Sequence, residues 1–139
     1  MINVLGIDHI VIRARNPSAM IEFYAGVLGC AVERDVSAEI GLTQLRAGSA
    51  LIDIVAVDSV LGQKGGAAPG ESGNNMDHFC LKIETVDETA LTDFLKTHNV
   101  SFSDFERRYG GEGYGRSIYV TDPEGNVVEL RGAGQSEIG

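Results

Sequence analysis

Hydrophobic and polar residues follow one another in short runs along the chain, and the order of these runs predicts strands around a helix. Residues 7–13, IDHIVIR, are typical of a strand, and residues 16–29 carry apolar side chains at helical spacing. Asn16 is suited to cap this helix, Pro17 to its first position and Gly29 to its end. Three strand-like runs follow, at residues 31–36, 41–47 and 50–57. The first part of the chain is therefore predicted to fold as a β-α-β-β-β unit.

The same order of elements recurs in the second part of the chain. Residues 76–84, MDHFCLKIE, predict a strand that opens like the first one, with Asp and His before a largely apolar run. Residues 87–99 predict a helix that begins at Asp87 or at the Thr85–Glu88 pair. Three further strands are predicted near residues 100–106, 116–121 and 126–131, with a tight turn, DPEGN, between the last two.

This repeat predicts one α+β domain built from two tandem β-α-β-β-β modules. The domain covers residues 1–139, with module one at about 4–57 and module two at about 76–131. Residues 58–75, rich in Gly, Pro and polar side chains, are predicted to form the linker. This linker lacks the glycine spacing of a phosphate-binding loop.

Composition and charge narrow the classes of partner. The formal charge is −9, and an acidic chain repels phosphate backbones, so we expect no nucleic-acid partner. No apolar run approaches the length that spans a bilayer, and the N-terminus shows no secretory signal, so we expect no membrane partner. Cys30 and Cys80 have no framework spacing, which indicates free thiols and a cytoplasmic protein.

Two histidines stand at equivalent positions of the repeat. Because a strand alternates its side chains between two faces, His9 lies opposite Ile10 and Ile12, which offer the apolar face on which a helix would pack. His78 has the same relation to the apolar residues that follow it. A structural role is the ordinary interpretation of one such histidine, but two in the same repeat position favour a shared function.

A carboxylate interrupts the last strand of each module. Asp53 lies between apolar residues in ALIDIVAV, and Glu129 lies in the same position of NVVELRG. A charge inside an apolar strand is costly unless it is paired or binds a metal. An exposed residue on an alternating strand is the simpler alternative for either carboxylate alone.

The repeat thus offers two imidazoles and two carboxylates, namely His9, Asp53, His78 and Glu129. This donor set suits a divalent transition metal, Zn, Ni, Co, Mn or Fe. The absence of thiolate ligands disfavours a structural zinc site, and two histidines disfavour Mg or Ca. The type of metal stays open because nitrogen and oxygen ligands discriminate weakly among these ions.

Three stretches, GIDHIVIRARNPSAMIEFYAGVLGC, MDHFCLKIE and SIYVTDPEGNVVELRG, resemble the vicinal oxygen chelate superfamily, which contains glyoxalases, bleomycin-resistance proteins and dioxygenases. The resemblance implies a U-shaped, cup-like mixed sheet with helices outside, and a homodimer. It implies His9, His78 and Glu129 as metal ligands. Asp53 matches a fourth ligand position, where its shorter side chain leaves direct or water-bridged coordination open. The resemblance also leaves open whether the metal site forms within one chain or between two chains.

The resemblance implies bidentate binding of a small, oxygen-rich substrate by the metal. We expect a lyase or isomerase of glyoxalase or epimerase type, in which Glu129 or Asp53 removes a proton beside a carbonyl. The alternatives are a fosfomycin-resistance-type epoxide-opening transferase, an extradiol-type dioxygenase and a metal-free drug-binding protein. The further histidine that such a dioxygenase needs could only be His98, at a helix end.

The Gly-rich segment at residues 106–117 is the candidate substrate lid. Arg107, Arg108 and Arg116 could pair with a carboxylate or phosphate of the substrate, and Tyr119 could donate to an oxyanion. A surface hairpin and a core tyrosine are the structural alternatives.

Overall fold

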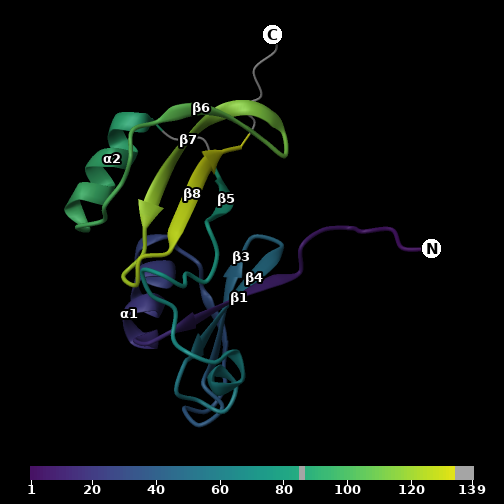
Figure 1. Ribbon diagram of the computed structural model, residues 1–139. Coiled ribbons are helices and arrows are strands. Elements are labelled where there is room, and N and C mark those ends of the chain that lie inside the picture. Colours follow the sequence, from purple (N-terminus) through teal and green to yellow (C-terminus); the bar gives the residue numbers. More distant parts are fainter. Residues whose placement is uncertain (85–86, 134–139) are drawn as a thin grey trace. The chain divides into compact units, whose positions relative to one another are not determined.

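The computed structural model describes residues 1–84 and 87–133, and the chain divides into two compact units, Met1–Asn75 and Met76–Gly139. The first unit contains four strands and one interrupted helix, in the order β1 (His9–Ala14), α1 (Pro17–Ile21), η1 (Glu22–Val27), β2 (Val32–Asp35), β3 (Leu42–Ala47) and β4 (Ala50–Ala56), and a short 3₁₀ helix, η2 (Gly62–Gly65), follows them. The second repeats this order with β5 (Phe79–Ile83), α2 (Glu88–Thr97), β6 (Glu106–Gly110), β7 (Gly113–Thr121) and β8 (Val127–Gly132). The predicted α+β class and the two β-α-β-β-β modules are confirmed (Figure 1).

The two sheets have the same strand order, β1-β4-β3-β2 in the first unit and β5-β8-β7-β6 in the second. In each sheet the first and last strands of the module run parallel, and the other neighbours are antiparallel. A parallel pair needs a long crossover, which the helical segment of each module supplies. The first and last strands, which carry the predicted metal ligands, are therefore hydrogen-bonded neighbours in both units.

Apolar residues of each module gather on the face of the sheet that the helix covers. In the first unit Ile12, Ile52 and Ile54 are almost fully buried, together with Met20 of α1, which packs on β4. Burying one such side chain stabilises the fold by roughly 1.5–3 kcal/mol. The second unit buries a corresponding set, consisting of Leu95 on α2 with Ile118, Val120, Val128 and Leu130 on β7 and β8.

The predicted caps form as hydrogen bonds at both helix starts. Asn16 Oδ1 accepts from the amide of Ala19 at 3.1 Å, and Asp87 Oδ1 accepts from the amide of Ala90 at 2.9 Å. Of the alternative start, Thr85 lies outside the described residues. Gly29 ends the first helical segment at a φ of +79°, a conformation that favours glycine.

The strand predicted at residues 100–106 is wrong in position. Phe102 makes an isolated bridge to Val120, with backbone hydrogen bonds from Ser103 to Tyr119 and from Thr121 to Ser101. The amide of Tyr119 donates to the hydroxyl of Ser103 at 3.0 Å in place of a backbone carbonyl, so the pairing does not continue as a regular strand. β6 begins only at Glu106 and forms a hairpin with β7. Much of the predicted lid segment is thus paired β-structure.

Several hydrogen bonds hold the predicted linker within the first unit, among them that from the amide of Val60 to the carbonyl of Glu39 at 3.1 Å. The Arg13 guanidinium donates to the carbonyl oxygens of Gly66 and Ala67, each at 3.0 Å. A Cβ on Gly62 would lie 1.8 Å from the carbonyl oxygen of Ala56, so this close approach of two backbone segments needs glycine. No helix among the described residues is long and apolar enough to cross a membrane.

Candidate metal centre

The first unit places His9 and Asp53 on the same face of its sheet. β1 and β4 run in register, with Val11 opposite Asp53, and His9 lies two residues before Val11. The side chain of His9 is 48% exposed, whereas Asp53 is buried. This is the face opposite Ile12 and the helix, as the alternation predicts.

Each member of this pair has a further polar partner. Nδ1 of His9 lies 2.6 Å from Oδ1 of Asp8, and this hydrogen bond, with the charge of Asp53, raises the pKa of His9. The amide of Gln44 on β3 donates to both carboxylate oxygens of Asp53, at 3.2 and 3.3 Å. These hydrogen bonds satisfy a buried charge that would otherwise be costly.

The second unit places His78 and Glu129 in the equivalent positions. Nε2 of His78 lies 3.3 Å from Oε1 of Glu129, and its Nδ1 lies 2.6 Å from Oδ2 of Asp77. Glu129 is buried, and the His78 side chain is 33% exposed. The ring of Tyr119 contacts the imidazole edge to face, with centroids 5.2 Å apart.

The spacing within the second pair fits a shared metal ion. Two ligands that each lie about 2.1 Å from an ion, with about 90–110° between them, are roughly 3.0–3.4 Å apart. The 3.3 Å between the imidazole nitrogen of His78 and the carboxylate oxygen of Glu129 falls in this range. The donors are also of the nitrogen and oxygen types that divalent transition metals accept. Within the described part of the chain, no group of three or more His, Cys, Asp or Glu side chains forms a metal site.

The cysteines do not compete with these donors. Cys80 lies opposite Glu129 in the register of β5 and β8. The loss of water around its thiol and the nearby Glu129 carboxylate raise the pKa of Cys80 to about 11. Burial likewise raises the pKa of Cys30. Both thiols therefore stay protonated at neutral pH, which leaves imidazole and carboxylate as the ready ligands.

Tyr119 and Arg108 share the face of Glu129. Tyr119 is paired with Glu129 in the register of β7 and β8, and the Arg108 guanidinium stacks on the Tyr119 ring at 4.3 Å. Arg108 also donates to the carbonyl and hydroxyl oxygens of Ser117, at 2.7 and 3.0 Å. These contacts hold a cation beside the candidate metal ligands.

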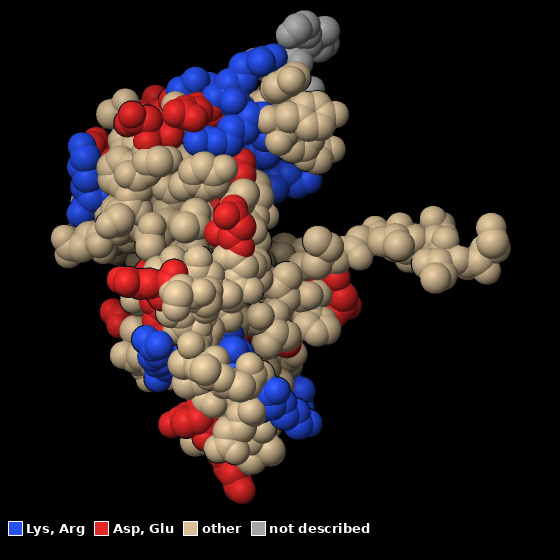
Figure 2. Space-filling view, in the orientation of Figure 1, with Lys and Arg blue, Asp and Glu red and all other residues tan. Residues whose placement is uncertain are grey.

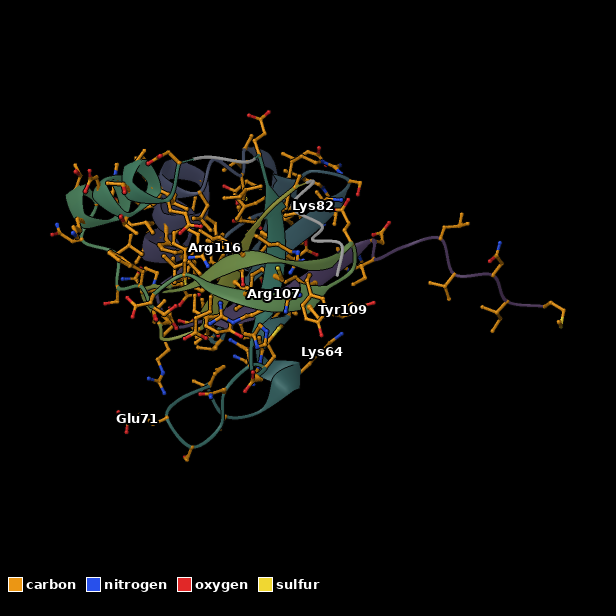
Figure 3. All side chains as sticks on the ribbon, turned by 90° about the horizontal axis from the view of Figure 1, so that it is seen from above. Lys64, Glu71, Lys82, Arg107, Tyr109 and Arg116 are labelled. Atoms are coloured by element: carbon orange, nitrogen blue, oxygen red, sulfur yellow. The ribbon has the colours of Figure 1, made fainter. Side chains whose placement is uncertain are left out.

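Arg107 and Arg116 lie on the opposite face. They are paired with each other in the register of β6 and β7. Arg116 forms a two-point ion pair with Glu88 of α2, at 2.5 and 2.9 Å, and Arg107 stacks on the ring of Tyr114. Figure 2 shows Lys and Arg gathered over the part of the second unit that carries β6 and β7, and Figure 3 labels Arg107 and Arg116 there. Their assignment as substrate ligands stays a prediction, which this placement does not favour.

Four residues near the two pairs were missed from the sequence. Gln44 gave no signal because its role depends on the register of β3 with β4. Arg131 is buried and donates to the backbone oxygens of Arg108 and Gly113. Asp8 and Asp77 did carry a signal, since the dipeptide Asp-His occurs at the same place in both modules.

Comparison with protein families gives a match over nearly the whole chain. Residues 6–130 match the model of the Glyoxalase/Bleomycin resistance protein/Dioxygenase superfamily. The chain belongs to this superfamily. The resemblance carried by the two Asp-His strands and the DPEGN turn is therefore confirmed. No curated protein matches this superfamily member in sequence.

Solved structures of similar fold come from several bacteria. An integron cassette protein from the V. cholerae mobile metagenome matches with a TM-score of 0.78 at 20% identity, over 96% of this chain and 98% of its own. A virulence protein from Salmonella typhimurium matches with a TM-score of 0.75 at 23% identity, over 94% and 98%. A lactoylglutathione lyase from Agrobacterium tumefaciens matches with a TM-score of 0.64 at 17% identity, over 94% and 95%. At such identities these similarities establish the fold of this superfamily member and not its reaction.

Proposed function

We propose that this chain is a divalent-metal-dependent lyase or isomerase of glyoxalase or epimerase type. The observation that carries the proposal is the pair formed by His78 and Glu129, whose nitrogen and oxygen stand 3.3 Å apart, as two ligands of one ion would. The equivalent pair, His9 and Asp53, occupies the same strands and face of the other unit. The four residues together would hold Zn, Ni, Co, Mn or Fe, within one chain or across a homodimer.

The chemistry proposed for this centre is removal of a proton beside a carbonyl. A bound divalent ion would supply a Lewis acid that stabilises negative charge on two neighbouring substrate oxygens. Glu129 or Asp53 would accept the proton, and the same carboxylate could return it to the neighbouring carbon, whereas epimerisation would need the other carboxylate to donate a proton to the opposite face. Both carboxylates are buried, which keeps bulk water from competing for the proton.

Arg108 would bind an anionic group of the substrate. Its guanidinium is held against Tyr119 and Ser117 on the face of Glu129, and its side chain is 19% exposed. Nη2 of Arg108 pairs with the Glu106 carboxylate at 3.2 Å, so an anionic substrate group would take the place of Glu106. A positioned guanidinium can bind a carboxylate or phosphate with two hydrogen bonds. Tyr119 itself would donate to a substrate oxygen. The proposed substrate is therefore a small carbonyl compound that carries an anionic group.

The positions of other residues give less support to the alternative reactions. His98 is the histidine that ring cleavage would need, and its Nδ1 lies 2.9 Å from the Phe94 carbonyl at the end of α2. Its ring also packs on Phe94. In proteins of the epoxide-opening type, the position equivalent to Asp53 would carry no carboxylate. We therefore place proton abstraction first and keep a cytoplasmic homodimer as part of the proposal.

The proposal is tested by hydrogen exchange in D₂O. The protein is loaded in turn with Zn²⁺, Ni²⁺, Co²⁺ and Mn²⁺ and incubated with small carbonyl compounds that carry a carboxylate or phosphate. We expect the NMR signal of the hydrogen beside the carbonyl to disappear with the loaded wild type and to persist with Glu129→Gln. Exchange with none of the compounds by a metal-loaded protein would overturn proton abstraction. Failure to bind any of the ions would overturn the metal dependence and favour the drug-binding alternative.

A further inference from the structure

We infer that Asp8 and Asp77 are positioning residues, each of which fixes the tautomer and orientation of the histidine that follows it, so that Nε2 is the ligand atom. In both pairs the contact joins Nδ1 of the imidazole to a carboxylate oxygen at 2.6 Å. The purpose of this positioning, metal binding, rests on the proposed function. The two Asp–His hydrogen bonds themselves each lie within one unit.

The direction of these hydrogen bonds follows from the chemistry of the groups. A carboxylate can only accept, so Nδ1 must carry the proton in both histidines. A neutral imidazole has one N–H, which leaves Nε2 with a free lone pair. In the second unit Nε2 is the atom that lies 3.3 Å from Glu129, a contact that is an ion pair when the imidazole is protonated, so the free lone pair belongs to the neutral imidazole alone. The atom that the hydrogen bond leaves unprotonated is thus the one that faces the other candidate ligand.

The backbone makes room for this contact at the start of each strand. Neighbouring residues within a strand point to opposite faces, so an Asp inside the strand could not reach the histidine beside it. β1 begins at His9 and β5 begins at Phe79, so both aspartates precede the regular strand. The carbonyl of Asp8 accepts from the amide of Leu51 at 2.9 Å, which holds this residue against β4.

The exposure of the two aspartates indicates that they act on the neighbouring histidines and contribute little to the stability of the fold. The side chains of Asp8 and Asp77 are 91% and 95% exposed, so neither contributes to a core. An isolated exposed pair stabilises a protein by about 0–1 kcal/mol. Two occurrences of one contact, with the same atoms at the same distance, are therefore better explained by what they do to the imidazole. Ligand histidines in metal sites commonly donate their second N–H in this way.

The tautomers can be measured without metal or substrate. Two-bond hydrogen–nitrogen correlation spectra, recorded at a pH where the imidazoles are neutral, distinguish a protonated Nδ1 from a protonated Nε2. We expect wild-type His9 and His78 to carry the proton on Nδ1. Asp8→Ala should shift His9 alone towards the Nε2–H form, and Asp77→Ala should shift His78 alone. Asn at either position, whose amide oxygen also accepts, should preserve the wild-type tautomer.

The same variants report on metal binding through chelator competition with Zn²⁺ and Co²⁺. We expect each alanine variant to lose about 10-fold in affinity, at the lower end of what outer-shell partners contribute. The Asn variants should lose less. The control is Asp93→Ala, which removes the charge of an exposed aspartate on α2. Asp93 is distant in sequence from His9 and His78, so this variant should change neither the tautomers nor the metal affinity.

The outcomes separate this inference from the proposed function. Tautomers that are Nε2–H in the wild type, or that do not change in the alanine variants, would overturn the positioning role. Equal metal affinity in wild type and alanine variants would also overturn it. A wild type that binds neither Zn²⁺ nor Co²⁺ would instead overturn the proposed function, whatever the tautomers.

Discussion

The two candidate half-sites share residue types and strand positions, but their carboxylates have different partners. Glu129 reaches its histidine, with 3.3 Å between the carboxylate and Nε2 of His78. Asp53 is one methylene shorter, and both of its oxygens accept from Gln44 on the neighbouring strand. Gln44 and Tyr119 occupy equivalent positions, each paired with the carboxylate of its unit.

This difference separates the two carboxylates, although they occupy equivalent positions of the repeat. In the second unit the imidazole and the carboxylate are already arranged as neighbouring ligands. In the first unit the amide of Gln44 directs Asp53 within its own sheet, and Asp53 affects His9 through its charge, which helps to raise the pKa of His9. In the proposed centre, Glu129 would therefore bind the ion directly and Asp53 would bind it less directly, through water or at longer range.

The largest expected effect comes from exchanging each carboxylate for its amide. Glu129→Gln should lower proton exchange and Zn²⁺ affinity by about 100-fold or more, because it removes both a ligand and a candidate base. Asp53→Asn should lower Zn²⁺ affinity by a smaller factor. Isothermal titration and exchange in D₂O measure both effects. A larger loss in Asp53→Asn than in Glu129→Gln would break the comparison.

Lengthening the shorter carboxylate should make the first half-site more similar to the second. Asp53→Glu should raise Zn²⁺ affinity by about 10-fold, since it replaces an indirect contact by a ligand equivalent to Glu129. Chelator competition measures the change, and Asp58→Glu on an exposed turn is the matched control. Weaker binding in Asp53→Glu would show that Asp53 already coordinates at its natural length.

Removing the amide partner of Asp53 should affect stability. Gln44→Leu leaves a buried carboxylate without its two amide hydrogen bonds, which should cost about 1–3 kcal/mol in the free energy of unfolding. Gln63→Leu removes an exposed glutamine whose amide donates to the Asp58 carbonyl, and it should cost less than about 0.5 kcal/mol. Urea unfolding of both variants checks the difference, and equal costs would contradict the role given to Gln44.

The smallest expected effect concerns the ion pair on the helix face of the second unit. Arg116 lowers the pKa of Glu88 below its ordinary value of 4.5, so the pair stabilises the fold above that pH and is lost as Glu88 takes up a proton in acid. Arg116→Gln should therefore lower the melting temperature slightly at pH 7, by the equivalent of at most about 0.5 kcal/mol. The difference from wild type should shrink below pH 4.5, and a constant difference would refute the assignment.

Local pattern was enough to predict most of the fold and the four candidate ligands. The caps at Asn16 and Asp87, the turn at residues 122–126 and the alternation around His9 and His78 depend on neighbouring residues, and a sequence contains that information. Asp122 confirms the turn, since its carboxylate accepts from the amides of Glu124 and Asn126 at 2.9 Å.

Strand register and long-range contacts could not be predicted from the sequence. The side-chain hydroxyl of Ser103 interrupts the strand predicted at residues 100–106, and only the fold brings it to Tyr119. The same holds for Gln44, whose partner Asp53 lies on the next strand. The faces of Arg107 on β6 and Arg116 on β7 follow from the register of these two strands, which the composition of the Gly-rich segment does not contain.

The proposed function requires both histidines to bind the same ion, within one chain or across a homodimer. Metal content and Zn²⁺ stoichiometry of chelator-treated and reloaded protein test it most directly, in wild type, His9→Ala and His78→Ala, with His98→Ala as the control. We expect about one ion per chain in wild type and control, and loss of the ion in either of the other two variants. Two ions per chain, or an ion lost in His78→Ala but retained in His9→Ala, would contradict it.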